Sequence, residues 1–110
     1  MSEVNQTPET SAIHNKIDQL LTENRVVLFM KGSPQFPMCG FSARAVAILQ
    51  ELGTEFFAVD VIQDNSMREG IKVYGNWPTI PQLYLKKELV GGSDIMMEMF
   101  ESGELKGMLA

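Results

Sequence analysis

The chain has 110 residues, 45% apolar and 21% charged, which is the composition of an ordinary globular protein, so we expect one domain over residues 1–110. Its formal net charge of −5 argues against nucleic acid or an anionic membrane surface as a partner. No apolar run reaches membrane-spanning length, and the polar first dozen residues do not resemble a secretory signal.

The first half of the chain predicts a helix, a strand and a second helix. Thr7 and Pro8 are typical of a helix start with Thr7 as the cap, although we expect residues 1–10 to form a flexible N-terminal extension. Residues 26–30 are all apolar and suit a strand buried on both faces. A helix then begins at Cys39 or Gly40 and stops at Gly53. Its predicted apolar face consists of Phe41, Ala45, Ile48, Leu49 and Leu52.

The second half predicts three strands, two short helices and a polar tail. They are a strand over residues 56–61, a helix from Asp64 or Asn65 to Gly75, strands over residues 82–85 and 89–90, and a helix over residues 95–100. A strand–helix–strand unit implies a parallel pair, and the last two strands imply an antiparallel hairpin. The predicted fold class is α/β, a four-stranded mixed sheet flanked by helices.

Cys39 is the only cysteine, so the chain cannot form an internal disulfide, and we expect a reducing, cytoplasmic location. With one cysteine and one histidine, His14, the chain cannot build a Cys/His zinc site, and metal chemistry would need ligands from outside. A lone cysteine is often a buried, inert residue. At a helix start, however, unpaired N–H groups and the helix dipole lower a thiol pKa, and Lys31 would add to this effect.

The motif Cys39-Gly40-Phe41-Ser42 has a serine where a dithiol oxidoreductase has its second cysteine. A serine cannot attack a mixed disulfide to release the product. The reaction cycle must therefore use an external thiol, and glutathione is the abundant one.

Together with Lys31-Gly32, residues 77–81 (WPTIP) and residues 91–94 (GGSD), this motif makes the chain resemble a monothiol glutaredoxin of the CGFS class. The resemblance extends from about residue 11 to residue 107. It implies a thioredoxin-like fold with a cis peptide bond between Ile80 and Pro81.

The resemblance also implies a glutathione site whose residues lie far apart in the sequence. The glycine carboxylate of glutathione should meet Lys31 and Arg68, its cysteinyl backbone should pair with Ile80, and its γ-glutamyl end should meet Ser93 and Asp94. The complete set is Lys31, Cys39, Arg68, Ile80, Pro81, Ser93 and Asp94. The alternatives are that Lys31 and Arg68 are solvated surface charges and that Ser93 and Asp94 only cap a helix. Many glutaredoxins have a second cysteine where Ser93 stands, and Trp77 is interpreted as a packing residue.

Resemblance to this class implies that the chain binds and transfers a 2Fe-2S cluster, with Cys39 as its metal ligand. Such a cluster needs four ligands, and two Cys39 thiolates with two glutathiones supply four in a homodimer. BolA-family proteins and apo iron–sulfur acceptors are the implied protein partners. The alternatives are glutathione-dependent thiol–disulfide exchange (protein deglutathionylation) at Cys39 and a non-catalytic interaction domain. The loop over residues 33–37 favours the cluster carrier, because the family links this loop to slow disulfide chemistry.

Overall fold

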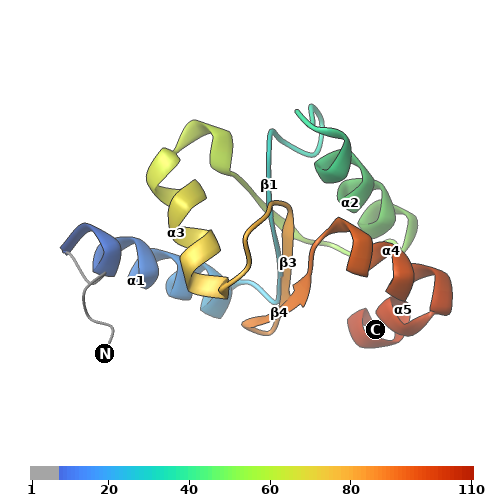
Figure 1. Cartoon of the computed structure of the whole chain (residues 1–110). Coiled ribbons are helices and arrows are strands. Elements are labelled where there is room, and N and C mark those ends of the chain that lie inside the picture. The colour runs from blue at the N-terminus through green and yellow to red at the C-terminus, as the bar shows by residue number, and fades with distance from the viewer. Residues whose placement is uncertain (1–7) are drawn as a thin grey trace.

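The computed structural model describes residues 8–110 as one mixed sheet with helices on both faces (Figure 1). The helices are α1 (Pro8–Glu23), α2 (Gly40–Glu51), α3 (Asn65–Gly75), α4 (Ser93–Ser102) and α5 (Glu104–Leu109), with a 3-10 turn, η2 (Val61–Gln63). The strands are β1 (Val26–Met30), β2 (Phe57–Asp60), β3 (Gln82–Leu85) and β4 (Glu88–Gly91). None of these helices is long and apolar enough to cross a membrane.

The sheet has the strand order β2-β1-β3-β4. Strand β1 pairs with β2 in parallel and with β3 in antiparallel, and β3 and β4 form an antiparallel hairpin. All five residues of β1 are buried, because it lies inside the sheet with helices over both faces. The predicted fold class, the parallel pair and the hairpin are confirmed.

Alternating side chains of β1 separate two hydrophobic cores. Val26, Leu28 and Met30 pack in one core with residues of α2, α4 and α5, whereas Val27 and Phe29 pack in the other with residues of α1 and α3. Helices α1 and α3 therefore cover one face of the sheet, and α2, α4 and α5 cover the other, as Figure 1 shows.

Several helix boundaries agree with their sequence signals. Helix α1 begins at Pro8, so residues 8–10 are the start of a helix, while Thr7, its predicted cap, lies outside the described residues. Asp64 caps α3 by accepting a hydrogen bond from the Met67 N–H at 3.2 Å. Helix α3 ends at Gly75, as predicted.

The predicted strand over residues 56–61 is too long at both ends. Strand β2 ends at Asp60, whose carboxylate accepts hydrogen bonds from the N–H groups of Ile62 at 2.9 Å and Gly32 at 3.0 Å. Asp60 therefore caps the turn η2 and at the same time holds the segment that follows β1.

The predicted polar tail is wrong, because residues 104–109 form helix α5. Gly103 ends α4 with a φ of 86°, which glycine adopts readily, and α5 starts at once. Leu105 and Leu109, one helical turn apart, are buried against the core that α2 and α4 also cover. Helix α4 is likewise longer than the predicted residues 95–100.

Candidate functional site

Cys39 stands at the head of α2, where a loop meets the first helical turn. Its backbone is extended (φ −158°, ψ 153°), as at a helix N-cap, and the residue is partly exposed. Its Sγ accepts a hydrogen bond from the main-chain N–H of Ser42 at 3.3 Å. The sulfur therefore occupies the position at which N–H groups and the helix dipole favour a negative charge, as the sequence predicts.

The hydroxyl of Ser42 connects this thiol to the end of β1. Ser42 is fully buried, and its Oγ accepts a hydrogen bond from the main-chain N–H of Lys31 at 3.0 Å. The same Oγ lies 3.6 Å from Cys39 Sγ, so its own proton is available to the thiolate. Ser42 was predicted only to replace a second thiol, and this role was missed, although a hydroxyl three residues after the cap was a usable signal.

The pKa of the Cys39 thiol is set by opposing effects. Burial raises the pKa, whereas hydrogen bonds from the Ser42 hydroxyl and from the N–H groups of Ser42 and Phe41 lower it. The positive charge of Lys31 lowers it further, and the net result is a pKa below the ordinary value for cysteine. The predicted direction is thus confirmed, with Ser42 contributing more than Lys31.

The loop before Cys39 is closed by its own main chain. The Met38 N–H donates to the Lys31 carbonyl at 2.8 Å, and Ser33 and Phe36 exchange main-chain hydrogen bonds of 3.2 and 3.0 Å. Gly32 has a φ of 89°, and a Cβ there would collide with the main chain of Phe36 and Met38. The loop is therefore a fixed turn, and it needs glycine at position 32.

Three apolar side chains around Cys39 face solvent. The exposed fractions are 79% for Phe36, 64% for Met38 and 58% for Phe41. The prediction that Phe41 belongs to the buried face of its helix is wrong, because residue 41 lies in the first turn of α2, where its side chain lines a groove instead.

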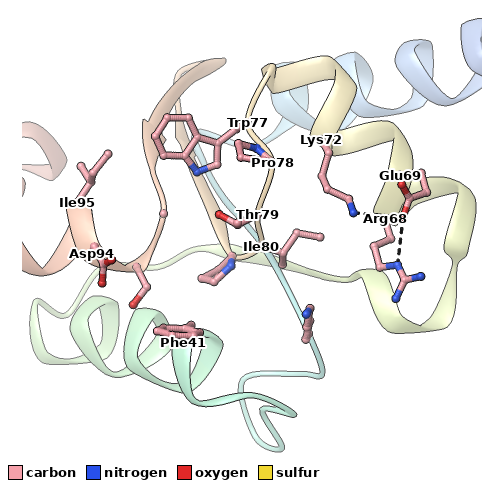
Figure 2. Close-up of a pocket in the computed structure, with 14 residues that line it drawn as sticks. Phe41, Arg68, Glu69, Lys72, Trp77, Pro78, Thr79, Ile80, Asp94 and Ile95 are labelled. Carbon is pink, nitrogen blue, oxygen red and sulfur yellow. Dashed lines mark ion pairs between the residues drawn. The ribbon is translucent and has the colours of Figure 1, made fainter. Parts of the chain in front are cut away.

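This groove has a volume of about 610 Å³ and runs between α3 and α4 (Figure 2). It passes residues 76–81, the connector that joins α3 to β3. Most of the residues that the resemblance assigns to glutathione line it, and they are Lys31, Arg68, Ile80, Pro81, Ser93 and Asp94. Cys39 does not line the groove, but it lies two residues before Phe41, which does. The predicted cis bond between Ile80 and Pro81 is present.

The α3 end of the groove carries a cluster of positive charge. Lys31, Arg68 and Lys72 line it, together with a single carboxylate, that of Glu69. Glu69 lies 3.5 Å from Arg68 and 3.2 Å from Lys72, and Arg68 also donates to the Asn65 side chain at 2.9 Å. Two positive charges remain after this pairing, so a carboxylate ligand is favoured here. Lys72 was missed from the sequence, although it follows Arg68 by one helical turn.

The α4 end of the groove presents the N-terminus of a helix. Gly92 is the N-cap and offers no side chain to the free N–H groups, and Asp94 lies in the first turn, highly exposed and 3.8 Å from Arg44. Ser93 is 6% exposed, and its Oγ has no hydrogen-bond partner in the described part of the chain. Free main-chain N–H groups favour an anion, while Asp94 favours a cation. An amino acid zwitterion suits both.

The middle of the groove is formed by the connector, where Figure 2 shows Trp77, Pro78, Thr79 and Ile80 in a row. Trp77 was interpreted as a packing residue, but its ring lines the groove. Its indole N–H is buried and unpaired among the described residues, and a Cβ on Gly92 would lie 3.3 Å from that nitrogen. Trp77 therefore both lines the groove and packs against Gly92.

Over residues 8–110, no three His, Cys, Asp or Glu side chains gather in a way that could hold a metal ion. Cys39 is the one thiolate that the chain supplies. An iron–sulfur cluster bound at Cys39 would therefore take its other ligands from elsewhere.

Known proteins are similar to this chain in both sequence and fold. The family model described as glutaredoxin matches residues 26–90, which is more than half of the chain. An uncharacterized monothiol glutaredoxin ycf64-like protein of Synechocystis is 55% identical over 102 residues, which cover 93% of this chain and 92% of that protein.

Two solved structures extend the comparison. Reduced apo GrxS14 of poplar has a TM-score of 0.80 at 44% identity, covering 92% of this chain and 93% of that one. A buckwheat glutaredoxin solved with glutathione has a TM-score of 0.81 at 23% identity, covering 92% and 90%, and shares the fold. That fold is thioredoxin-like. The chain belongs to the glutaredoxin family, among its monothiol members.

Proposed function

We propose that this chain binds glutathione in the groove and, as a glutathione-bridged homodimer, holds a 2Fe-2S cluster at Cys39 and transfers it to other proteins. The observation that carries the proposal is the pairing of one activated thiol with a groove charged at both ends. One chain supplies a single thiolate, and its neighbouring site suits a ligand that carries a second.

The charge pattern of the groove supports glutathione as that ligand. Glutathione has a carboxylate at its glycine end and an amino acid zwitterion at its γ-glutamyl end. Lys31, Arg68 and Lys72 suit the first, while the N–H groups of α4 and the Asp94 carboxylate suit the second. Main-chain groups of Ile80, between the two ends, would pair with the cysteinyl residue as an added strand.

The ligand count supports the dimer. A 2Fe-2S cluster takes four ligands, and thiolates are its usual ones. Two Cys39 thiolates and the thiolates of two bound glutathiones make four. The exposed side chains of Phe36, Met38 and Phe41 lie within three residues of Cys39 in the chain, and in this proposal they contact the second subunit or a partner protein. BolA-family proteins and apo iron–sulfur acceptors are the proposed partners, in the cytoplasm.

Anaerobic reconstitution tests this proposal directly. The chain is mixed with iron, sulfide and glutathione, and the product is measured by visible absorption, analytical ultracentrifugation and glutathione release in acid. We expect a coloured dimer with one glutathione per chain and a colourless monomer without cluster. A stable cluster on a monomer, or one without glutathione, would contradict the bridged model.

The lowered pKa of Cys39 favours a second candidate function, protein deglutathionylation. The Cys39 thiolate would attack the glutathionyl sulfur of a protein mixed disulfide, so that the protein thiolate leaves and Cys39 becomes glutathionylated. A second glutathione thiolate would then attack that glutathionyl sulfur, releasing oxidised glutathione and the Cys39 thiolate. Steady-state turnover of a glutathionylated peptide measures this activity independently of iron.

A further inference from the structure

Behind the connector that forms the middle of the groove lies a buried glutamine, Gln82, the first residue of β3. Its side chain is fully buried, on the sheet face that α1 and α3 cover, where Tyr84 and Phe29 pack. The Gln82 Nε2 donates to two main-chain carbonyls of the connector, those of Trp77 and Thr79, both at 3.1 Å. One side chain thus spans the connector from behind.

The remaining atom of this amide is also paired. The Gln82 Oε1 accepts a hydrogen bond from the hydroxyl of Tyr84 at 2.9 Å. Burial raises the pKa of Tyr84, so this hydroxyl stays protonated and remains a donor. Because two carbonyls require donors and the tyrosine requires an acceptor, the partners fix which end of the amide carries the nitrogen.

The surrounding packing leaves this group little freedom. Gly75, the last residue of α3, lies so close that an added Cβ would collide with the Tyr84 hydroxyl and come within 3.0 Å of Gln82 Oε1. The Tyr84 ring is held edge-on against Phe29, at a centroid distance of 5.6 Å. A fully paired buried amide in close packing is rigid, and its loss leaves carbonyls unsatisfied.

The connector needs such support because its own main chain offers few donors. Pro78 and Pro81 have no N–H, so two of the residues between α3 and β3 cannot donate main-chain hydrogen bonds. The main chain of Ile80 lies between Thr79, whose carbonyl Gln82 binds, and Gln82 itself, which pairs with Phe29 in the sheet. Ile80 is therefore held on both sides by the same residue.

We propose that Gln82 is a positioning residue for ligand binding, which holds the connector so that the main chain of Ile80 is ready to pair with an extended peptide ligand. This inference rests on the proposed glutathione site. Holding the binding backbone in place before the ligand arrives removes the ordering cost from binding. Gln82 does not itself contact the ligand, since it lies behind the connector and does not line the groove.

The test compares the full chain with its Gln82→Met variant, which keeps the length of the side chain and removes both donors. Glutathione affinity is measured by calorimetry, and the backbone order parameters of Thr79 and Ile80 by NMR relaxation. We expect the variant to bind glutathione at least about fivefold more weakly, with lower order parameters at both residues. Tyr84→Phe should show a smaller loss in the same direction, because the amide keeps its two donors.

Leu109→Ala is the matched control, since Leu109 is buried in α5 and does not line the groove. It should lower stability without changing glutathione affinity. Equal affinity in Gln82→Met and the wild type would overturn the positioning role, whatever the order parameters. A wild-type chain that does not bind glutathione would contradict the proposed function, and this inference with it.

Gln82→Glu keeps the question answerable if Gln82→Met does not fold. Burial raises the pKa of a carboxyl group. Below that pKa the acid donates one hydrogen bond to the connector, and above it the carboxylate donates none. Glutathione affinity, expressed relative to the wild type at each pH, should therefore be best in acid and fall as pH rises. A ratio that does not change with pH would overturn the proposal.

Discussion

At the head of α2, groups from a short stretch of chain stabilise the negative charge of a single sulfur, that of Cys39. They are the side chain and N–H of Ser42, the N–H of Phe41 and the charge of Lys31. The groove beside it is assembled differently, from residues of α3, the connector and α4, with several charges at one end and free main-chain N–H groups at the other. The function of the first region depends on one atom, the Cys39 sulfur, whereas that of the groove is distributed over several side chains and main-chain groups.

This contrast predicts where substitutions have large and small effects. Chemistry at Cys39 has no substitute within the chain, so its loss should be complete. Ligand binding in the groove rests on exposed charges and on main chain, and exposed charges contribute little each because water screens them. A side-chain substitution there removes one contact among several. Effects on function should therefore decrease from substitutions at Cys39 to single substitutions in the groove.

Cys39→Ser should abolish cluster binding and cluster-linked dimerisation together, while the fold survives. The residue caps α2 and is partly exposed, and serine is a good helix cap, so circular dichroism should match the wild type. Omitting glutathione from wild-type reconstitution should have the same effect, because two thiolates cannot complete the cluster. A dimer or a cluster in the Cys39→Ser variant would show that other ligands exist.

Ser42→Ala should raise the pKa of Cys39 and slow its reactions at neutral pH. The wild-type thiol should titrate below the free-cysteine value of about 8.5, and loss of the Ser42 hydroxyl removes a hydrogen bond that favours the thiolate. A shift of one pKa unit would reduce the thiolate fraction by up to about tenfold at a pH below both values. The rate of iodoacetamide alkylation against pH measures the midpoint.

Lys31→Ala is the internal comparison for this experiment. Lys31 acts on Cys39 only through its charge, which lowers the pKa less than the hydrogen bonds do, so its alkylation midpoint should move less than that of Ser42→Ala. A larger shift in Lys31→Ala would show that charge, rather than hydrogen bonding, controls the thiol. Ser42→Ala should also lose about 1 kcal/mol of stability, because the part-buried Lys31 N–H loses its acceptor.

Single removal of the groove charges should have modest effects. Arg68→Ala and Asp94→Ala should each weaken glutathione binding by about 0.2–1 kcal/mol, since the side chains are 41% and 86% exposed and already paired with other charges. Arg68→Ala combined with Lys72→Ala should cost more than the two single changes together, if either cation can replace the other at one carboxylate. Calorimetry on Arg68→Ala, Lys72→Ala and the double variant decides this. Strict additivity would mean that the two cations have separate roles in binding.

The sequence carries signals for those parts of this architecture that depend on neighbouring residues. The all-apolar run of β1 and the Asp64 cap of α3 are local features, and both are where they were predicted. Helix α5 was missed because its stability is not local. Leu105 becomes buried only against the folded core, and the last carbonyls are bound by Arg25, which lies 84 residues away from Leu109 in the chain.

The candidate site divides in the same way. Charged residues at the spacings of a known motif, such as Lys31 and Asp94, were placed in the groove because the motif carries long-range information. Ser42 and Lys72 carried signals at helical spacing that were overlooked, whereas the role of Gln82 depends on which main-chain groups the fold brings to it, and no spacing rule states that. Phe41 was misassigned because a first-turn position can face either the core or the groove.

Ser93→Ala should have the smallest effect on binding and is the sharpest test of main-chain recognition at the α4 end. The Ser93 hydroxyl is buried and unpaired within the described residues, so its removal should leave stability unchanged or raise it by up to about 1 kcal/mol. If the N–H groups of α4 hold the γ-glutamyl carboxylate, glutathione affinity should stay within about twofold of the wild type, because alanine keeps those groups. Chemical denaturation and calorimetry on the same samples separate the two effects. An affinity loss of about tenfold or more would mean that the hydroxyl turns to the ligand on binding, and recognition at this end would then rest on a side chain as it does at the other.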